Sequence, residues 1–181
     1  MFKSLVGGLI FSLAFSIPAF GEDLKINKEK SKIEFVGKKP DGKHAGGFKD
    51  LTASAKVDHE TPSNSTLTIE IKTESLWSDN EKLTAHLKNP DFFKVKEYPT
   101  IKFESTKIEV SGDEGTITGK LTMLGKTVEV KVPIKAEMSD TSLKVMADFK
   151  IDRTKWGLGV PYANGKIDDD VSIKAELVFP R

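Results

Sequence analysis

Eight stretches of the chain alternate apolar and polar side chains with a period of two, which is typical of a β-strand with one buried face. They cover residues 32–35, 51–57, 67–72, 101–104, 117–123, 128–138, 143–151 and 171–179. The polar positions are mostly Lys, Glu and Thr, so one face of each strand is suited to water. Strands of this kind bury the other face by closing into a barrel or by packing as a sandwich. We expect an all-β fold, a single antiparallel barrel of eight strands.

One interval, residues 78–93, departs from this pattern and predicts a short helical insertion between strands. Ser78 and Glu81 have the spacing of a capping box, with Ser78 at the N-cap and Glu81 at N3. Leu83 and Leu87 follow at helical spacing, and Pro90 ends the helix or opens a second short turn. The insertion also has an apolar side that we expect to cover one end of the barrel, formed by Phe92, Phe93 and Tyr98.

Residues 1–21 are typical of a secretory signal peptide. Lys3 precedes an uncharged apolar run at 5–17, and small residues at 19 and 21 place the cleavage site after Gly21. The run is shorter than the roughly 20 residues that a membrane span requires, and the alternative is an uncleaved anchor. We therefore expect a mature domain at 22–181 that is periplasmic or secreted and is not an integral membrane protein.

Loss of Lys3 with the signal leaves 27 basic and 27 acidic residues, from 28 and 27 in the whole chain. This balance argues against nucleic acid as a partner, because surfaces that bind nucleic acid are basic. The chain has no Cys, so it forms no disulfide and carries no thiol-linked lipid anchor. Packing and backbone pairing must therefore supply its stability.

The sequence lacks the residue patterns of catalytic, cofactor-binding and metal-binding sites. There is no Cys nucleophile and no Gly-x-Ser-x-Gly motif. His44, His59 and His86 are scattered without the spacing of metal ligands, and the acidic run at 168–170 lacks the spacing of a calcium loop. We expect no enzyme activity, no cofactor and no bound metal.

Small residues recur on the apolar faces of the predicted strands, which suggests space inside the barrel; they are Ala53, Ala55, Gly119, Ala136, Ala147 and Ala175. An eight-stranded barrel either fills its interior with side chains or holds one ligand. The pattern leaves two interpretations open: a tunnel for an alkyl or isoprenoid chain, or a filled core in a periplasmic interaction or stress-related protein. For the tunnel, the residues expected to line the lumen are Phe35, Phe48, Ala53, Ala55, Ile69, Ile71, Phe103, Leu121, Val132, Ala136, Ala147, Phe149 and Ala175.

Four further residues are candidates for the mouth of such a tunnel. Arg153 continues the inward phase of the strand at 143–151, where its guanidinium could hold a polar head group or form an internal ion pair that closes the barrel. Trp77 continues the phase of the strand at 67–72, although Trp is also common in a core. We place Trp156 near the same mouth as Arg153. His86 is either a gate or head-group contact, or a polar helix residue bonded to a neighbouring loop.

Pro133 falls on the outward face of the strand at 128–138. A proline there predicts a bulge or a poorly paired edge, because it has no N–H to donate. An edge of this kind leaves a homodimer open as an alternative to a monomer.

Several motifs, taken in order, resemble the YceI-like family of exported lipid-binding proteins. The longest motif runs from His86-Leu87 through Asp91-Phe92-Phe93 to Tyr98-Pro99-Thr100-Ile101-Lys102-Phe103-Glu104-Ser105-Thr106. Shorter ones lie at 31–35, 46–48, 119–125, 153–157 and 169–171, so the resemblance covers nearly all of 23–179. The resemblance implies a lipocalin-like antiparallel barrel in the bacterial periplasm or outside the cell. It also implies that the tunnel holds an isoprenoid or another long amphiphile.

The chain departs from the pattern of that family at three positions. Many members carry an Arg-Asp pair before the His-Leu motif, where this chain has Leu83 and Thr84. Many also carry an acidic residue after the Arg-Thr or Arg-Ser pair, where this chain has Lys155. Head-group contacts or salt bridges that those residues make in other members therefore do not carry over to this chain.

Overall fold

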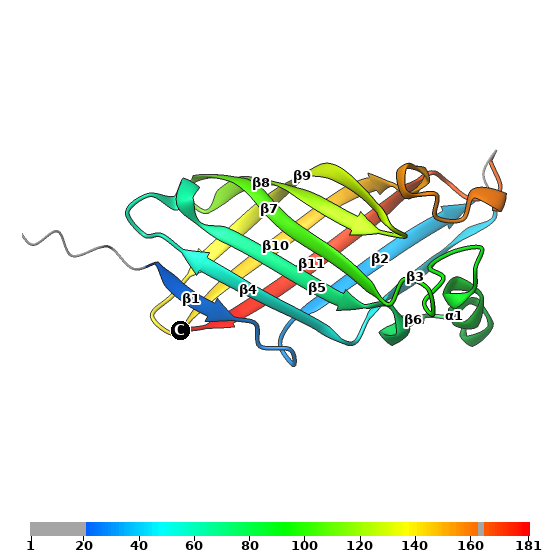
Figure 1. The fold of residues 1–181 in the computed structure, drawn as a ribbon, viewed down its shortest axis with the longest axis horizontal. Coiled ribbons are helices and arrows are strands. Elements are labelled where there is room, and N and C mark those ends of the chain that lie inside the picture. Colours follow the sequence, from blue (N-terminus) through cyan, green and yellow to red (C-terminus); the bar gives the residue numbers. More distant parts are fainter. Residues whose placement is uncertain (1–20, 163–164) are drawn as a thin grey trace, which may run out of the picture.

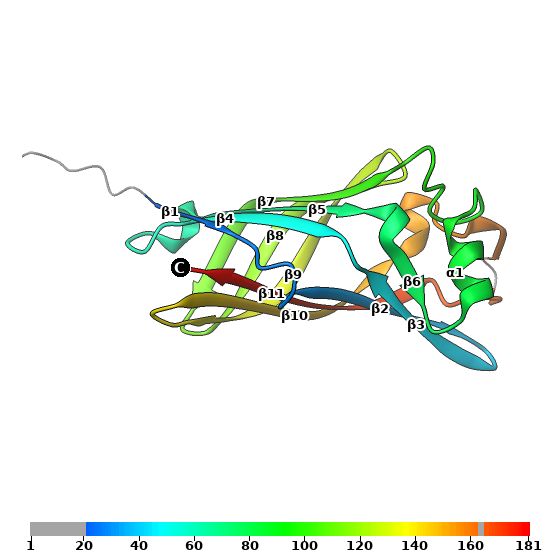
Figure 2. The same ribbon diagram turned by 90° about the horizontal axis from the view of Figure 1, so that it is seen from below.

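The structure, a computed structural model, describes residues 21–162 and 165–181. They form one antiparallel sheet of eleven strands that curls into a barrel-like shape (Figures 1 and 2). The strand order is β1-β4-β5-β7-β8-β9-β10-β11-β2-β3-β6. The strands are β1 (Glu22–Lys25), β2 (Lys32–Lys39), β3 (Gly42–Phe48), β4 (Leu51–Val57), β5 (Thr66–Lys72), β6 (Leu76–Ser78), β7 (Thr100–Ser111), β8 (Glu114–Met123), β9 (Lys126–Met138), β10 (Ser142–Asp152) and β11 (Asp170–Pro180). The predicted signal peptide, apart from Gly21, lies outside the described residues.

The all-β, barrel-like fold is confirmed, but the structure has eleven strands where the sequence predicted eight. All eight predicted stretches are strands, and the additional ones are β1, β3 and β6. Only residues 49 and 50 separate β3 from β4, and only the 3₁₀ turn η2 (Thr73–Ser75) separates β5 from β6. Backbone bonds from Lys49 N to the Ser75 carbonyl and from Lys72 N to the Asp50 carbonyl carry the pairing across both breaks. Thus β3–β4 and β5–β6 are two long bent strands, and their pairing returns the sheet on itself.

The alternation pattern misses β3 because its sequence is rich in glycine and does not alternate. A Cβ on Gly46 would lie 2.5 Å from both the Phe35 ring and the Trp77 carbonyl oxygen. A Cβ on Gly47 would lie 2.7 Å from the Ile33 carbonyl oxygen. Neighbouring groups therefore occupy the space that a side chain would need on both faces of β3, and glycine is required.

The predicted insertion contains the helix α1 (Glu81–Lys88), followed by turns at 90–93. Asn80 is its N-cap and accepts a hydrogen bond from Leu83 N at 3.0 Å, so the predicted cap at Ser78 is wrong. Ser78 instead ends β6, where it pairs with Gly46. The helix lies at the end of the barrel opposite the C-terminus (Figure 2). No helix in the described ranges is long and apolar enough to cross a membrane.

The end of the barrel near the C-terminus is filled by large apolar side chains. Leu143 pairs with Phe179 across β10 and β11, and Ala55 of β4 has Leu24 on one side and Leu67 on the other. All five side chains are buried, and Phe179 has no exposed surface. This part of the interior is a packed core, so any ligand space must lie toward α1.

The close packing around Gly46 predicts that a side chain there will destabilise the fold. In Gly46→Val the new atoms meet backbone as well as the Phe35 ring, so relief requires β3 to shift. We expect a loss of about 1–3 kcal/mol in the free energy of unfolding, measured by urea denaturation. Gly42→Ala in the same strand is the control, because its Cβ would come no closer than 3.9 Å to Lys39. Equal stability of the two variants would contradict this account of β3.

Candidate ligand-binding cavity

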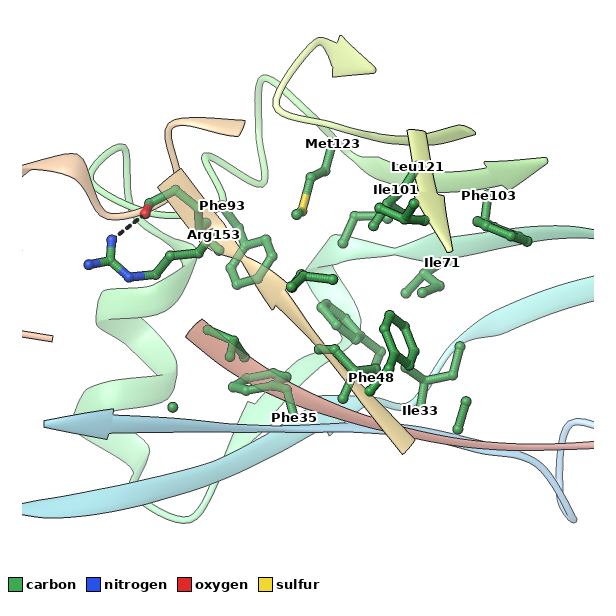
Figure 3. A pocket seen from close by; sticks show the side chains of 18 of the residues that line it. Ile33, Phe35, Phe48, Ile71, Phe93, Ile101, Phe103, Leu121, Met123 and Arg153 are labelled. Atoms are coloured by element: carbon green, nitrogen blue, oxygen red, sulfur yellow. Dashed lines mark hydrogen bonds between the residues drawn. The ribbon is translucent and has the colours of Figure 1, made fainter. Parts of the chain in front are cut away.

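A cavity of about 360 Å³ occupies the part of the barrel next to α1. Figure 3 shows apolar side chains from several strands pointing into it, including Phe35, Ile71 and Leu121. The insertion contributes Leu83, Leu87, Phe92 and Phe93 to the same wall. A cavity of this size and apolar character falls within the range of small-molecule sites in proteins.

Ten of the thirteen residues predicted to line the lumen face this cavity. They are Phe35, Phe48, Ile69, Ile71, Phe103, Leu121, Val132, Ala147, Phe149 and Ala175. Ala53, Ala55 and Ala136 do not line it. Ala53 and Ala55 are buried in β4, where Ala55 belongs to the filled end next to Leu24. Ala136 lies on β9 beyond Ile134 and pairs with Val145, which lines the cavity although Ala136 does not.

Small residues contribute to the cavity only where no large neighbour occupies their space. Ala147 and Ala175 pair directly across β10 and β11, and both line the cavity. Gly119, by contrast, leaves no free volume, because a Cβ there would lie 2.4 Å from the Phe103 ring. The predicted association of small inward residues with open space therefore applies to the Ala147–Ala175 pair and fails at Gly119.

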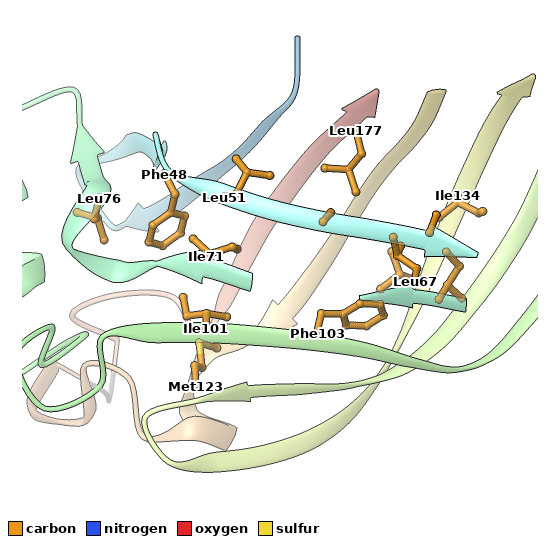
Figure 4. Close-up of a cluster of buried hydrophobic side chains, with 14 of the residues drawn as sticks. Phe48, Leu51, Leu67, Ile71, Leu76, Ile101, Phe103, Met123, Ile134 and Leu177 are labelled. Carbon is orange, nitrogen blue, oxygen red and sulfur yellow. The ribbon is translucent and has the colours of Figure 1, made fainter. Parts of the chain in front are cut away.

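Several inward-facing apolar side chains around the cavity are only partly buried. Phe35, Ile69, Phe149 and Ile173 are of this kind, although each lines the cavity. Figure 4 shows the buried apolar cluster, which includes side chains such as Leu67 and Ile134 as well as residues such as Ile71 that also line the cavity. Apolar surface that faces inward and stays accessible gains free energy when a nonpolar molecule covers it.

Arg153 lies at the end of β10 and is 2 % exposed, and all five of its N–H groups are engaged. Its Nε donates to the Asp168 carbonyl at 2.9 Å. Nη1 donates to the carbonyls of Leu158 and Gly159 at 2.7 and 3.0 Å. Nη2 donates to the Ile167 carbonyl at 3.0 Å and to Asp169 Oδ1 at 3.1 Å. An arginine has five donors, so none remains for a head group. The geometry matches the alternative in which Arg153 forms an internal ion pair that closes the barrel end.

The other three mouth candidates do not line the cavity. Trp156 is 2 % exposed in the 3₁₀ turn η3 (Arg153–Trp156), and its Nε1 donates to the Leu121 carbonyl at 3.0 Å. Trp77 is half-buried opposite Gly47, because the η2 turn shifts the alternation and gives the inward position to Leu76. His86 packs edge-on against Phe92 and Tyr162, with ring centroids 5.1 and 5.4 Å apart.

The sequence argument missed three basic residues that line the cavity near the β2–β3 hairpin. They are Lys38, Lys39 and His44, and with Arg153 they are the ionisable residues of its described lining. His44 Nδ1 lies 2.9 Å from Asp79 Oδ1, and the Ala45 N–H donates to Asp79 Oδ2 at 3.0 Å. The Ala45 N–H and then His44 hold the pKa of the Asp79 carboxyl below its ordinary value. Lys39 is an even number of residues from Phe35 on the same strand, so alternation places both on the inward face. The argument that placed Arg153 inward would therefore also have predicted Lys39 in the lumen.

The model of the YceI-like domain matches residues 24–179. The chain belongs to the YceI-like family. This YceI-like chain is 33% identical to Protein YceI of Escherichia coli O157:H7 over 142 residues, which cover 75% of this chain and 73% of that protein. The resemblance predicted from the sequence motifs is therefore confirmed.

Two solved structures share the YceI-like fold. BcnA of Burkholderia cenocepacia superposes with a TM-score of 0.79 at 26% identity, covering 84% of this chain and 98% of its own. A domain from Saccharophagus degradans superposes with a TM-score of 0.66, covering 87% of this chain and 97% of its own. That domain is described as polyisoprenoid-binding and as implicated in plant cell wall breakdown. Its 12% identity to this chain shows a shared fold alone.

The hydrogen bonds of Arg153 predict a structural role for this residue. Arg153→Met leaves four carbonyls and a carboxylate without their donor, and we expect a loss of about 3 kcal/mol or more in the free energy of unfolding. Asp169→Asn is the control and should cost less than about 1 kcal/mol, because Asp169 is 59 % exposed and Asn keeps an acceptor. A stable Arg153→Met protein that loses affinity only for anionic ligands would restore the head-group role.

Proposed function

We propose that the protein is an exported carrier or sequestering protein that binds a long-chain isoprenoid or a similar amphiphilic lipid in its lumen. The observation that carries this proposal is the apolar cavity, whose inward side chains remain partly accessible. It favours the ligand tunnel over the filled core that the sequence left open. The polyisoprenoid-binding description of the Saccharophagus degradans domain adds support from a protein with the same fold.

Hydrophobic burial supplies the affinity in this proposal. Each CH₂ group that leaves water contributes about 0.8 kcal/mol, and a chain laid along the cavity buries many of them. The opposing filled end limits how far the chain can extend, so its tail lies toward the centre of the barrel and its polar end toward the β2–β3 hairpin. Binding alone accounts for the site, and we propose no reaction.

Export is proposed from residues 1–21, which have the organisation of a cleaved signal. In the periplasm or outside the cell, a protein with an apolar lumen would keep an otherwise insoluble chain in solution. The direct test is mass spectrometry of the mature protein, purified from its native envelope without detergent. A stoichiometric lipid of discrete mass supports the proposal, and its fragmentation identifies the head group. An unloaded protein that also takes up no added prenyl or fatty chain refutes it.

A large side chain in the cavity should block uptake. Ala175→Trp and Ala147→Trp each place an indole between the walls, and we expect affinity for a fluorescent prenyl chain to fall about tenfold or more, which is at least 1.4 kcal/mol. Lys174→Trp is the control, because residue 174 is the exposed neighbour of Ala175 on β11. Titration measures affinity, and thermal unfolding checks that each variant folds. Unchanged uptake by both folded alanine variants would contradict lumen binding.

The basic lining near the hairpin should favour an anionic head group. Reversing both charges in Lys38→Glu/Lys39→Glu should weaken binding of a fatty acid by about threefold to tenfold, the effect of roughly 1 kcal/mol from exposed charges. Binding of the corresponding fatty alcohol should stay within about twofold, because it carries no charge to repel. Lys43→Glu, on the same hairpin but outside the cavity lining, is the control. Equal losses for acid and alcohol would show that the lysines do not read head-group charge.

A further inference from the structure

The wall of the barrel is incomplete between β9 and β10. Their ladder runs from the Met138–Leu143 pair to the Ile134–Ala147 pair and ends there. Residues 126–133 of β9 and 148–152 of β10 have no partner across this boundary. We call this boundary the β9–β10 seam. On the β10 side it extends over five residues, or roughly 15 Å at the usual rise of a strand. Figure 2 shows β9 leaving β10 as it runs to its hairpin with β8.

Pro133 explains why the ladder ends where it does. The N–H of Ala136 donates to the Asp113 carbonyl, so the backbone groups of residues 136 and 134 face β8. Backbone groups alternate along a strand, and those of residues 135 and 133 therefore face β10. Residue 133 is the next position that should donate to β10, opposite Asp148, and a proline has no N–H. On the other side Pro133 pairs with Thr116, where its missing donor is not needed.

The seam adjoins the cavity directly. Val130 and Val132 on its β9 flank line the cavity, as do Phe149 and Ile151 on its β10 flank. Outside the barrel, a second hollow of about 410 Å³ lies where the ladder ends, lined by Pro133, Met146 and Asp148 among others. Ala147 lines both the cavity and this outer hollow. The two spaces therefore approach each other at Ala147, where the ladder ends.

The far end of the seam is held closed by η3. This turn packs against β9, and the Trp156 indole donates to the Leu121 carbonyl at 3.0 Å. The opening is therefore bounded by the Ile134–Ala147 pair at one end and by Trp156 at the other. It has defined limits and does not extend as a frayed edge of the sheet.

We propose that the β9–β10 seam is a lateral portal through which the hydrocarbon chain of the ligand enters and leaves the cavity, and that Pro133 keeps it unpaired. This inference rests on the proposed lipid-binding function and adds the path by which the lipid reaches the cavity. A sideways opening lets a chain pass from a lipid surface into the lumen along its length. It does not require the insertion that covers the barrel end to move. The other route is the end of the cavity at Lys38 and Lys39.

A reversible bridge across the seam tests the portal, and the chain has no Cys to interfere. In Lys131→Cys/Lys150→Cys the two thiols lie on opposite flanks of the seam, and Pro133 stays in place, so the reduced variant keeps the unpaired wall. A continued ladder would bring their Cα atoms to about 5.5 Å, within the range of a disulfide. Lys150→Cys/Ser172→Cys is the matched control, because it shares one cysteine and bridges β10 to its paired neighbour β11. Free-thiol titration verifies each bridge, and a short bis-maleimide replaces it where oxidation is incomplete.

The probe is cis-parinaric acid, a fluorescent fatty acid, measured by stopped flow during uptake and during transfer to phosphatidylcholine vesicles. Oxidation of the seam variant should slow uptake and release by about tenfold or more, with the dissociation constant within about twofold, because the bridge blocks a path and not the site. Reductant should restore both rates. The control bridge should change neither rate.

Two outcomes oppose the inference in different ways. Unchanged exchange in the bridged seam variant, with normal affinity, overturns the portal and assigns entry to the end at Lys38 and Lys39, while the proposed function stands. Failure of the unmodified protein to bind the probe, or an added prenyl alcohol, overturns the proposed function and the portal with it.

Discussion

The circumference of the curled sheet fixes an interior that alternate side chains must fill or leave open, and the other features of the protein depend on this constraint. Near the C-terminus Leu143, Leu67 and Phe179 are large side chains buried in one apolar cluster. Toward α1 the same strands place Ala147 and Ala175 side by side, and the walls no longer meet. The cavity therefore follows from side-chain size along continuous strands. It needs no separate domain or inserted pocket.

Two local features organise the end of the barrel next to α1. Arg153 gathers the carbonyls of 158–159 and 167–168 around one guanidinium, and these bonds hold the two segments together next to the end of β10. The η2 turn lets β5 bend into β6, which directs the chain to the insertion that covers this end. In a barrel without disulfides, hydrogen bonds thus hold this end, because backbone groups of its described irregular segments pair with a buried arginine and with neighbouring strands.

Period-two alternation predicted eight of the eleven strands because each of these has one solvent-facing side and one buried side. It could not find β3, whose glycines are set by the Phe35 ring and by Trp77 from elsewhere in the chain. Alternation along an unbroken strand correctly predicted which side chains face inward, as at Phe35 and Phe149. It failed at Trp77, because the 3₁₀ turn between β5 and β6 shifts the alternation by one residue. It placed Arg153 inward but could not show that four carbonyls and the Asp169 carboxylate of the following loop use all five of its donors. The sequence also could not show that Ala53 and Ala55 leave no space, because the size of the residues that face a small side chain decides whether a cavity forms.

The loss of pairing at Pro133 is tolerable because neither strand of the seam depends on it. Strand β9 keeps an unbroken ladder with β8 from Met123–Lys126 to Glu114–Lys135, and β10 pairs with β11 along its whole length. Each strand thus has one complete set of cross-strand bonds, and the groups left over on the seam side can bond to water. If the two strands had no complete ladder on their other sides, a gap in the pairing between them would expose an unpaired strand edge. Such an edge can unfold locally or pair with another chain. Position 133 confines the break to a stretch that is stable on both flanks and backed by the cavity, so the wall can be open there while the barrel stays folded.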